Sequence, residues 1–289
     1  MGNSVFLALI RYVGPWCAYL LLAPVSLYHL FSAPRAVSAS RDYLRRIDYG
    51  NVSWLAIFKH FFSFGKSLID RIAITAGNSQ RFQFIFQGED HIRQALAEGK
   101  GVVIISAHCG NWQAAANLLD RLDVAVNMAA YEAEVASLRK FSPLTSGKAR
   151  FSLISLEDSF AAGIQIMSAL RRREIVAMHA DRALDESLTI QVPFLGAAAR
   201  FPAGPFAVAA VSGAPLIHTF AMRVRDYHYH FYAYPAEHLS FSRKHRERQD
   251  QLRSWIGLFA ARLEETLRRY PLQWYNFYNF WEGSGPGSS

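Results

Sequence analysis

The stretch GVVIISA at residues 101–107 decides the fold, because it is an uninterrupted apolar run rich in β-branched residues. Such a run predicts a strand buried on both faces, as in a parallel sheet. Similar runs alternate along the chain with segments of helical spacing. Further strands are expected at residues 82–88, 124–130, 174–180, 215–224 and 227–234, and helices at 90–100, 113–122, 160–173 and 246–269. The alternation predicts an α/β fold with a central, mostly parallel or mixed sheet flanked by helices.

The composition fits one large domain, or one domain with a helical extension. Of the 289 residues, 51% are hydrophobic and 14% are aromatic, which is enough apolar material for a sizeable core. The aromatic share favours either a well-packed core or a face that meets lipid, because Trp and Tyr gather where a bilayer meets water.

The charge balance points to anionic partners, because the formal net charge is +8. Phosphate headgroups, acidic carrier proteins and nucleic acid all fit a basic protein. Lys and Arg are dispersed, without zinc-finger spacing or an RNP-like motif, so no nucleic-acid partner is expected. The two cysteines, Cys17 and Cys109, give no disulfide framework. The histidines at 179, 218, 228 and 230 lack metal-ligand spacing, so core or surface roles are expected and no metal is implied.

The amino-terminal segment 12–34 carries no charged residue and is long enough to cross a bilayer core. Pro15 and Pro24 are expected to kink it. A membrane anchor, spanning or half-inserted, a helix packed into the core, and a docking surface for another protein all fit this pattern. Four arginines follow within residues 35–46, which favours a cytoplasmic location for the body of the protein.

These features predict an anchor helix at residues 1–35, one domain at 36–281 and a flexible tail at 282–289. Residues 53–76 have apolar positions at helical spacing with charged residues between them. This pattern predicts an amphipathic helix, which lies on a membrane or covers a core.

The sharpest chemical signal is SAHCGNWQ at residues 106–113, directly after the buried strand. Open α/β sheets place ligand chemistry beyond the carboxyl ends of their strands, which is where His108 falls. Gly110 permits a close backbone approach, and a helix that begins near Gln113 offers amide donors to an anion. An imidazole can take a proton from a hydroxyl at cellular pH. The alternative is a histidine that only satisfies a turn.

Residues 108–112 resemble the HxGNW hallmark of the lipid A late acyltransferases, within the lysophospholipid acyltransferase-like group. His108, Gly110, Asn111 and Trp112 stand at the matching places. The resemblance continues through residues 179–217, which contain an Asp-Arg pair and a PFFG-like turn, and through the aromatic ending at 273–281.

The resemblance implies transfer of a fatty acyl group from acyl carrier protein, or from acyl-CoA, to a hydroxyl or amine of a membrane lipid or glycolipid. It implies no cofactor. Its expected setting is the bacterial inner membrane, with the catalytic domain on the cytoplasmic face. The implied catalytic residues are His108 and Gln113. The implied substrate-binding residues are Gly110, Asn111, Trp112, Asp181, Arg182, Phe194, Gly196, Arg200, Pro202 and Gly204.

One position departs from the HX4D/E pattern of the family, because Gln113 stands where the pattern has an acidic residue. A glutamine carbonyl can accept the ring N–H, but it cannot stabilise the charged ring. The missing charge is expected from Asp181, Glu132 or Glu134. Alternatively, Gln113 is an engineered substitution, or the chain is a weak or inactive family member that binds lipid or carrier in a larger assembly.

The tetrahedral oxyanion of an acyl transfer needs hydrogen-bond donors. Backbone amides near Gly110 and the guanidinium of Arg182 are the expected ones. Cys109 is not expected to be a nucleophile, because adjacent side chains on a turn usually point apart. An esterase of the α/β-hydrolase type is disfavoured, because no GxSxG elbow follows a strand.

Overall fold

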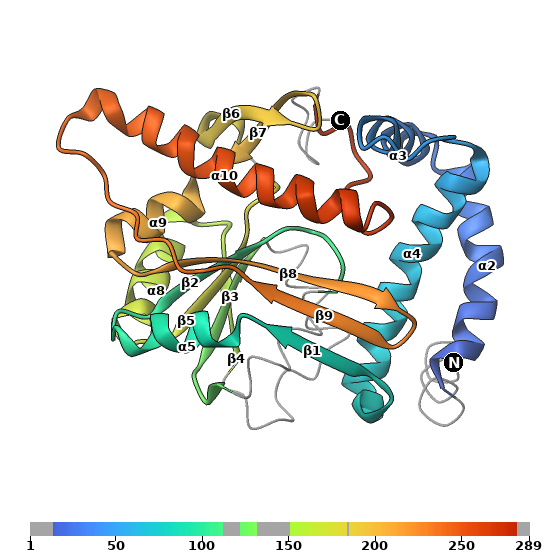
Figure 1. The fold of residues 1–289 in the computed structure, drawn as a ribbon, viewed down its shortest axis with the longest axis horizontal. Helices are drawn as coiled ribbons and strands as arrows, with labels where there is room; N and C mark the ends of the chain where they lie inside the picture. The colour runs from blue at the N-terminus through green and yellow to red at the C-terminus, as the bar shows by residue number, and fades with distance from the viewer. Residues whose placement is uncertain (1–13, 112–121, 132–150, 184, 282–289) are drawn as a thin grey trace.

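A seven-stranded sheet forms the centre of the computed structural model, which describes residues 14–111, 122–131, 151–183 and 185–281 (Figure 1). Its strands are β1 (Gln83–Gln87), β2 (Val102–Ser106), β3 (Val126–Ala130), β4 (Phe151–Ser155), β5 (Ile175–His179), β8 (Leu216–Arg225) and β9 (His228–Ala233). Their order across the sheet is β1-β9-β8-β2-β5-β3-β4. Every neighbouring pair is parallel except β8 with β9. The predicted α/β class with a mixed, mostly parallel sheet is confirmed.

The middle strands are apolar throughout because helices cover both faces of the sheet. All five residues of β2 are buried. Val103 and Ile105 share a core cluster with α8 (Ser159–Arg171), α9 (Gly204–Ser212) and α10 (Arg248–Arg269). Val102 and Ile104 share the other large cluster with α5 (Glu89–Ala97). Successive side chains of β2 therefore point to opposite faces of the sheet, and the core has one layer on each face.

Most of the predicted helices are present at or near their expected bounds. α5, α8 and α10 correspond to the segments expected at 90–100, 160–173 and 246–269. Asp158 caps α8, where its carboxylate accepts hydrogen bonds from the amides of Phe160 and Ala161. The helix predicted at 113–122 falls almost entirely outside the described residues.

A two-stranded hairpin, β6 (Thr189–Phe194) with β7 (Ala197–Pro202), stands apart from the main sheet. The sequence predicted only a turn here. Leu195 and Gly196 form the two-residue connection, and both have positive φ, as a type I′ hairpin turn requires. The hairpin packs on α10, where the Glu264 carboxylate accepts a hydrogen bond from the Leu195 amide at 2.8 Å.

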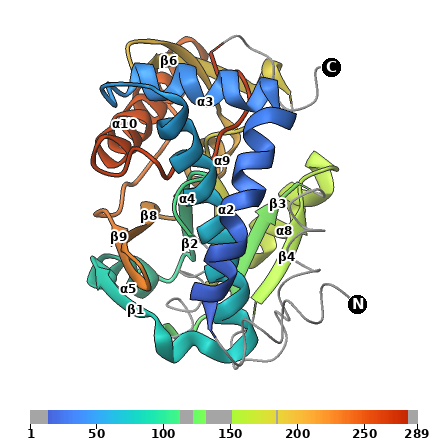
Figure 2. The ribbon, with the colours of Figure 1, turned by 90° about the vertical axis from the view of Figure 1, so that its right-hand side faces the viewer.

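Three helices precede the sheet and stand beside it (Figure 2). They are α2 (Pro15–Ser32), α3 (Pro34–Arg46) and α4 (Trp54–Ala73), and α4 confirms the helix predicted at 53–76. Pro34 disfavours helical geometry at Ala33, so α2 ends there and α3 leaves at 97°. Within the described residues, no single helix is long and apolar enough to cross a membrane, whereas the bent pair α2 and α3 reaches that length and composition together.

The outer side of α2 is apolar. α2 contains no Lys, Arg, Asp or Glu, and it packs on α4 through Ala18 and Tyr19. Seven of its large apolar side chains are nevertheless exposed, with Phe31 at 75% and Leu20 at 67%. The other five are Trp16, Leu21, Val25, Leu27 and Tyr28, and Trp54 and Leu55 at the start of α4 are exposed too. Several exposed apolar side chains on one helix are typical of a surface that contacts a membrane or another protein.

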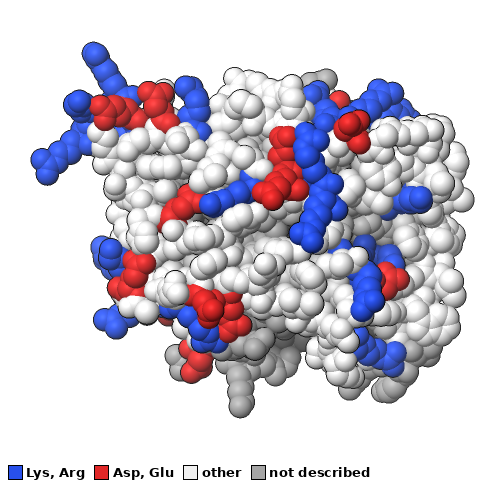
Figure 3. Space-filling model, viewed as in Figure 1, with Lys and Arg blue, Asp and Glu red and all other residues white. Residues whose placement is uncertain are grey.

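The face that carries α10 has charges of both signs (Figure 3). Arg262 pairs with Glu237, and Arg268 pairs with Glu264 at 2.8 Å. Positive side chains on this face are therefore interleaved with carboxylates rather than gathered into one stripe.

Candidate active site

His108 and Asp181 meet at the carboxyl ends of two neighbouring parallel strands. Ser106 at the end of β2 lies opposite His179 at the end of β5, so the residues two positions further along also lie opposite each other. His108 Nδ1 is 2.7 Å from Asp181 Oδ1, and the His108 backbone amide donates to Asp181 Oδ2 at 2.9 Å. A carboxylate at Nδ1 holds the ring proton there and leaves the basic lone pair on Nε2.

The Asp181 carboxylate is kept ionised although it is fully buried. Burial alone raises the pKa of Asp181, but the charge and hydrogen bond of His108 outweigh it. Arg182 and His179 add to that effect, and the pKa lies well below its usual range. The His108 side chain is 13% exposed, so its ring is accessible from outside while its partner is not.

Asp181 supplies the carboxylate that the sequence lacks at position 113. Asp181, one of the three acidic residues expected to replace it, lies against the ring. Glu132 and Glu134 lie outside the described residues, as do Trp112 and Gln113. Asp181 was also assigned to substrate binding from the resemblance; the geometry places its carboxylate against His108, and contact with substrate stays a prediction.

Residues 107–111 form a turn, here the His108 turn, and the amides of residues 108–111 are all hydrogen-bonded. The Cys109 amide donates to Ala107 O at 2.7 Å, and the amides of Gly110 and Asn111 donate to Gln273 O and Ala221 O at 2.8 Å. These three amides therefore already have acceptors. The oxyanion contact expected from amides near Gly110 or from Arg182 stays a prediction.

Gly110 is required by this packing. It has φ +59°, and a Cβ atom there would lie 1.9 Å from Ala221 O of β8. Any side chain would force the His108 turn away from the sheet, because no Cβ tolerates such an approach.

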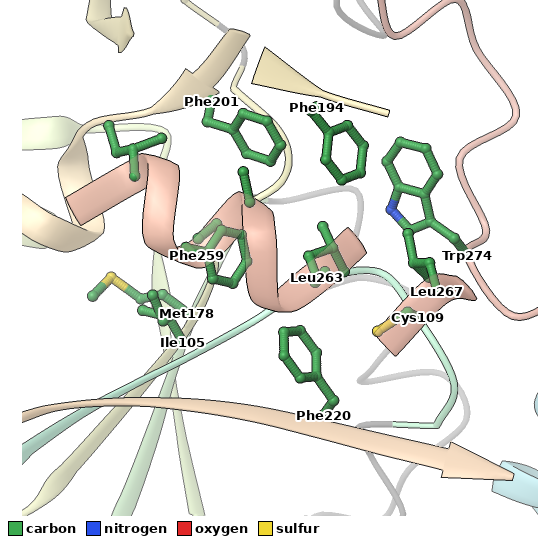
Figure 4. Packing of buried hydrophobic residues seen from close by; sticks show 14 of the residues in the cluster. Ile105, Cys109, Met178, Phe194, Phe201, Phe220, Phe259, Leu263, Leu267 and Trp274 are labelled. Carbon is green, nitrogen blue, oxygen red and sulfur yellow. The ribbon is translucent and has the colours of Figure 1, made fainter. Parts of the chain in front are cut away.

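Cys109 is a core residue. Figure 4 shows its sulfur among Leu263, Leu267 and Trp274, on the side of the His108 turn that faces α10. Burial raises the pKa of the Cys109 thiol, and the nearby Asp181 charge raises it further. Both effects disfavour a thiolate, so the prediction that Cys109 is not a nucleophile agrees with its surroundings.

The C-terminal segment, residues 271–281, is hydrogen-bonded to the His108 turn. Trp274 bridges Cys109 in antiparallel fashion, and the Tyr275 amide donates to His108 O at 2.9 Å. The Trp274 indole N–H donates to Asp181 Oδ2 at 3.0 Å. The Gln273 side chain exchanges two hydrogen bonds with the backbone of Arg223 on β8. Residues far apart in sequence thus hold one short turn.

Two cationic or basic side chains flank the pair. His179 lies beside His108, with ring centroids 4.1 Å apart and ring planes tilted by 46°. Arg182 donates from Nη2 to Tyr275 O at 2.7 Å, and its guanidinium carbon lies 5.7 Å from the centre of the Tyr278 ring. The C-terminal segment therefore positions Arg182 beside the carboxylate that it follows in sequence.

The family model of bacterial lipid A biosynthesis acyltransferases matches residues 57–282. The chain belongs to this family. A phosphatidylinositol mannoside acyltransferase of Mycobacterium tuberculosis strain H37Rv is 29% identical over 136 residues, which are 47% of this chain and 43% of that relative. The same enzyme from strain CDC 1551 is 28% identical over an equal span. The similar region thus covers less than half the length of these curated relatives.

A solved structure with a related outline is the 1-acyl-sn-glycerophosphate acyltransferase PlsC of Thermotoga maritima. It is 10% identical, with a TM-score of 0.38 over 87% of this chain and 97% of that one. A likeness at this level supports no statement about the site.

The other predicted substrate-binding residues of this family member lie in three settings. Asn111 is buried, and its Nδ2 lies 3.4 Å from Ser67 O, so it ties the His108 turn to α4. Phe194 is buried, with its ring 5.5 Å from that of Trp274. Pro202 is buried at the end of β7, whereas Gly196, Arg200 and Gly204 are exposed. Contact of these residues with substrate stays a prediction.

Three residues at the site were not assigned to it from the sequence. His179 was expected in a core or surface role, and it lies against the His108 ring. Trp274 and Tyr275 were noted only as part of an aromatic ending, and both contact the His108–Asp181 pair. The parallel register of β2 and β5 brings His179 close to His108. No local sequence pattern predicts that residue 274 contacts residue 181.

Proposed function

We propose that this chain transfers a fatty acyl group from a carrier thioester to a hydroxyl or amine of a membrane lipid or glycolipid, with His108 as general base. The observation that carries the proposal is the 2.7 Å contact between His108 Nδ1 and a buried, ionised Asp181. Membership of an acyltransferase family and the names of the curated relatives support the same reaction class.

In the proposed reaction, His108 Nε2 removes the proton of the acceptor hydroxyl while its oxygen attacks the thioester carbonyl carbon. Asp181 stabilises the resulting imidazolium, as a triad carboxylate does. The tetrahedral intermediate then collapses, the carbon–sulfur bond breaks, and the leaving thiolate takes the proton back from Nε2. The products are the acylated acceptor and the free carrier thiol, and no covalent acyl-enzyme is formed.

The guanidinium of Arg182 is the proposed donor to the oxyanion. The amides of Cys109, Gly110 and Asn111 are already bonded, which supports this assignment. A preorganised cation costs no reorganisation when the charge develops on the carbonyl oxygen.

The net charge supports the proposed acyl donor, and the exposed apolar side of α2 supports the proposed membrane location. The net charge of +8 suits an acidic acyl carrier protein, and acyl-CoA shares the same phosphopantetheine thioester. The exposed apolar side of α2 favours contact with the cytoplasmic face of the bacterial inner membrane, with residues 1–35 as the anchor, 36–281 as the catalytic domain and 282–289 as the tail. Such contact brings His108 to acceptors that never leave the bilayer.

The test incubates the purified full chain in phospholipid vesicles with acyl carrier protein thioester and bacterial membrane lipid extract. Wild type is expected to yield a lipid heavier by one fatty acid less one water, detected by mass spectrometry. His108→Ala is expected to abolish this product. His238→Ala is the matched control, because His238 is exposed and pairs with Glu98 at 2.8 Å. Equal, slow carrier release by all three proteins would show a family member that binds without turnover.

A further inference from the structure

Among the described residues, the Asp181 carboxylate has two side-chain hydrogen-bond partners, which are His108 and Trp274. The Trp274 ring is fully buried, and its Nε1 lies 3.0 Å from Asp181 Oδ2. The same oxygen accepts the His108 backbone amide at 2.9 Å, whereas Oδ1 faces His108 Nδ1 at 2.7 Å. The two carboxylate oxygens therefore have different partners: two N–H groups on one, and the imidazole on the other.

This division fixes the plane of the carboxylate. The terminal torsion of an aspartate is broad and roughly two-fold, so a carboxylate held through one oxygen can rotate. Two N–H donors on Oδ2 restrict that rotation and keep Oδ1 aimed at the ring. A donor on Oδ2 also spreads the negative charge away from Oδ1, which moderates how strongly Asp181 holds the protonated ring.

Trp274 is itself held firmly enough to act in this way. Its ring lies against Phe280 at 4.9 Å, Tyr43 at 5.0 Å and Phe194 at 5.5 Å between centroids, and Figure 4 shows it among the buried side chains. Its carbonyl accepts a hydrogen bond from His60 Nε2 at 2.8 Å. Packing on several sides and a fixed backbone leave the indole one orientation, with its N–H toward Asp181.

We propose that Trp274 is a positioning residue, whose indole N–H orients the Asp181 carboxylate and sets the proton affinity of His108. This inference rests on the proposed role of His108 as general base. Without the N–H, Asp181 holds the protonated ring more strongly and less directionally. The neutral, reactive form of His108 then predominates only at higher pH, and transfer slows at every pH.

The test compares Trp274→Phe with Trp281→Phe. Trp281 lies in the same C-terminal segment, stacks near Phe194, and donates its indole N–H to Phe194 O at 3.2 Å. Both substitutions remove one indole N–H and keep an aromatic ring, but only the first removes a donor from Asp181. A second variant carries 3-benzothienylalanine at position 274, which keeps the ring size and replaces N–H by sulfur if Trp274→Phe fails to fold.

The first readout is the NMR titration of ring-15N-labelled histidine, with the His108 signals assigned by their loss in His108→Gln. Among the described residues, the charged and titratable groups around the ring are Asp181, Arg182 and His179 at or just after the end of β5, Cys109 on the His108 turn, and Tyr275 and Tyr278 of the C-terminal segment. Neither variant changes any of them. The His108 midpoint is expected to rise by roughly half a pH unit in both position-274 variants and to stay at the wild-type value in Trp281→Phe.

The second readout is the pH profile of acyl transfer. The acid limb of kcat/KM is expected to move with the NMR midpoint, and kcat is expected to fall roughly tenfold, near the lower end of losses from removed outer-shell partners. KM is expected to stay nearly unchanged. An unchanged His108 midpoint, or an equal shift in Trp281→Phe, would overturn the inference. Persistent transfer by His108→Gln would instead refute the proposed function, while the NMR titration would still report on Trp274.

Discussion

Replacement of Asp181 by Asn perturbs the site by one atom and is expected to invert the proton positions on His108. Asp181 Oδ2 accepts from two N–H groups, the His108 amide and the Trp274 indole, so the Asn carbonyl oxygen occupies that place. The Asn NH2 group then faces His108 Nδ1, where Oδ1 stood at 2.7 Å. An NH2 group donates, so Nδ1 must become the acceptor and the ring proton must move to Nε2.

The rate loss follows from that inversion. A ring protonated at Nε2 presents no lone pair to the acceptor hydroxyl, and no carboxylate stabilises the imidazolium. The corresponding change in a serine-protease triad lowers kcat about 10⁴-fold, which corresponds to about 5 kcal/mol in the activation free energy. We expect a loss of that order in Asp181→Asn.

The assay measures thiol release from acyl carrier protein in the presence of lipid acceptor, together with the tautomer of His108 by 15N NMR. Asp185→Asn is the matched control, because Asp185 is exposed and its Oδ1 accepts a hydrogen bond from the Ser187 amide at 2.8 Å. Turnover by Asp181→Asn within about tenfold of wild type, with Nδ1 still protonated, would refute the reasoning from hydrogen-bond donors.

Three further predictions concern the turn, the missing acid and acid stability. Gly110→Ala is expected to lower the free energy of unfolding in urea by roughly 2–4 kcal/mol through overpacking and positive φ, whereas Gly163→Ala, which meets nothing within 4 Å, is not destabilising. Gln113→Glu is expected to change turnover less than about threefold, because Asp181 already serves the ring; a far larger increase contradicts that account. Burial lowers the pKa of His60 to about 4, against the opposing effect of a backbone hydrogen bond. The unfolded chain therefore takes up this proton at a higher pH than the folded chain does, so stability declines between about pH 6.5 and 4. His60 alone should account for about 2 kcal/mol of the loss at pH 5, which urea unfolding checks as a flatter dependence of stability on pH in His60→Gln.

The strands of the main sheet were largely predictable because burial on both faces imposes apolar runs. The segments at 101–107 and 174–180 became β2 and β5 within a residue or two. β4 was missed, since it is an edge strand whose residues are mostly half-buried. The β6–β7 hairpin was read as a turn, because Pro193 within β6 disfavours a strand assignment and permits only an edge position.

The His108–Asp181 pair was predictable from the sequence, because it depends on the same buried strands. His108 and Asp181 each follow a predictable strand, and parallel register brings them together. The donors that complete the site come from the C-terminal segment, which reaches the His108 turn through the Cys109–Trp274 bridge. Such a contact spans more than half of the chain, and no periodicity encodes it. The resemblance drew attention to the aromatic ending, but only the fold assigns Trp274 to Asp181.

The central claim is that the His108 ring performs the proton transfer of an acyl transfer reaction. A single-turnover measurement tests it most directly, with enzyme in excess over radiolabelled acyl carrier protein thioester and lipid acceptor present. Wild type is predicted to move the label into lipid, and His108→Gln is predicted to slow that step by about 10³-fold or more at neutral pH. Label that reaches lipid at the wild-type rate in His108→Gln would contradict the account.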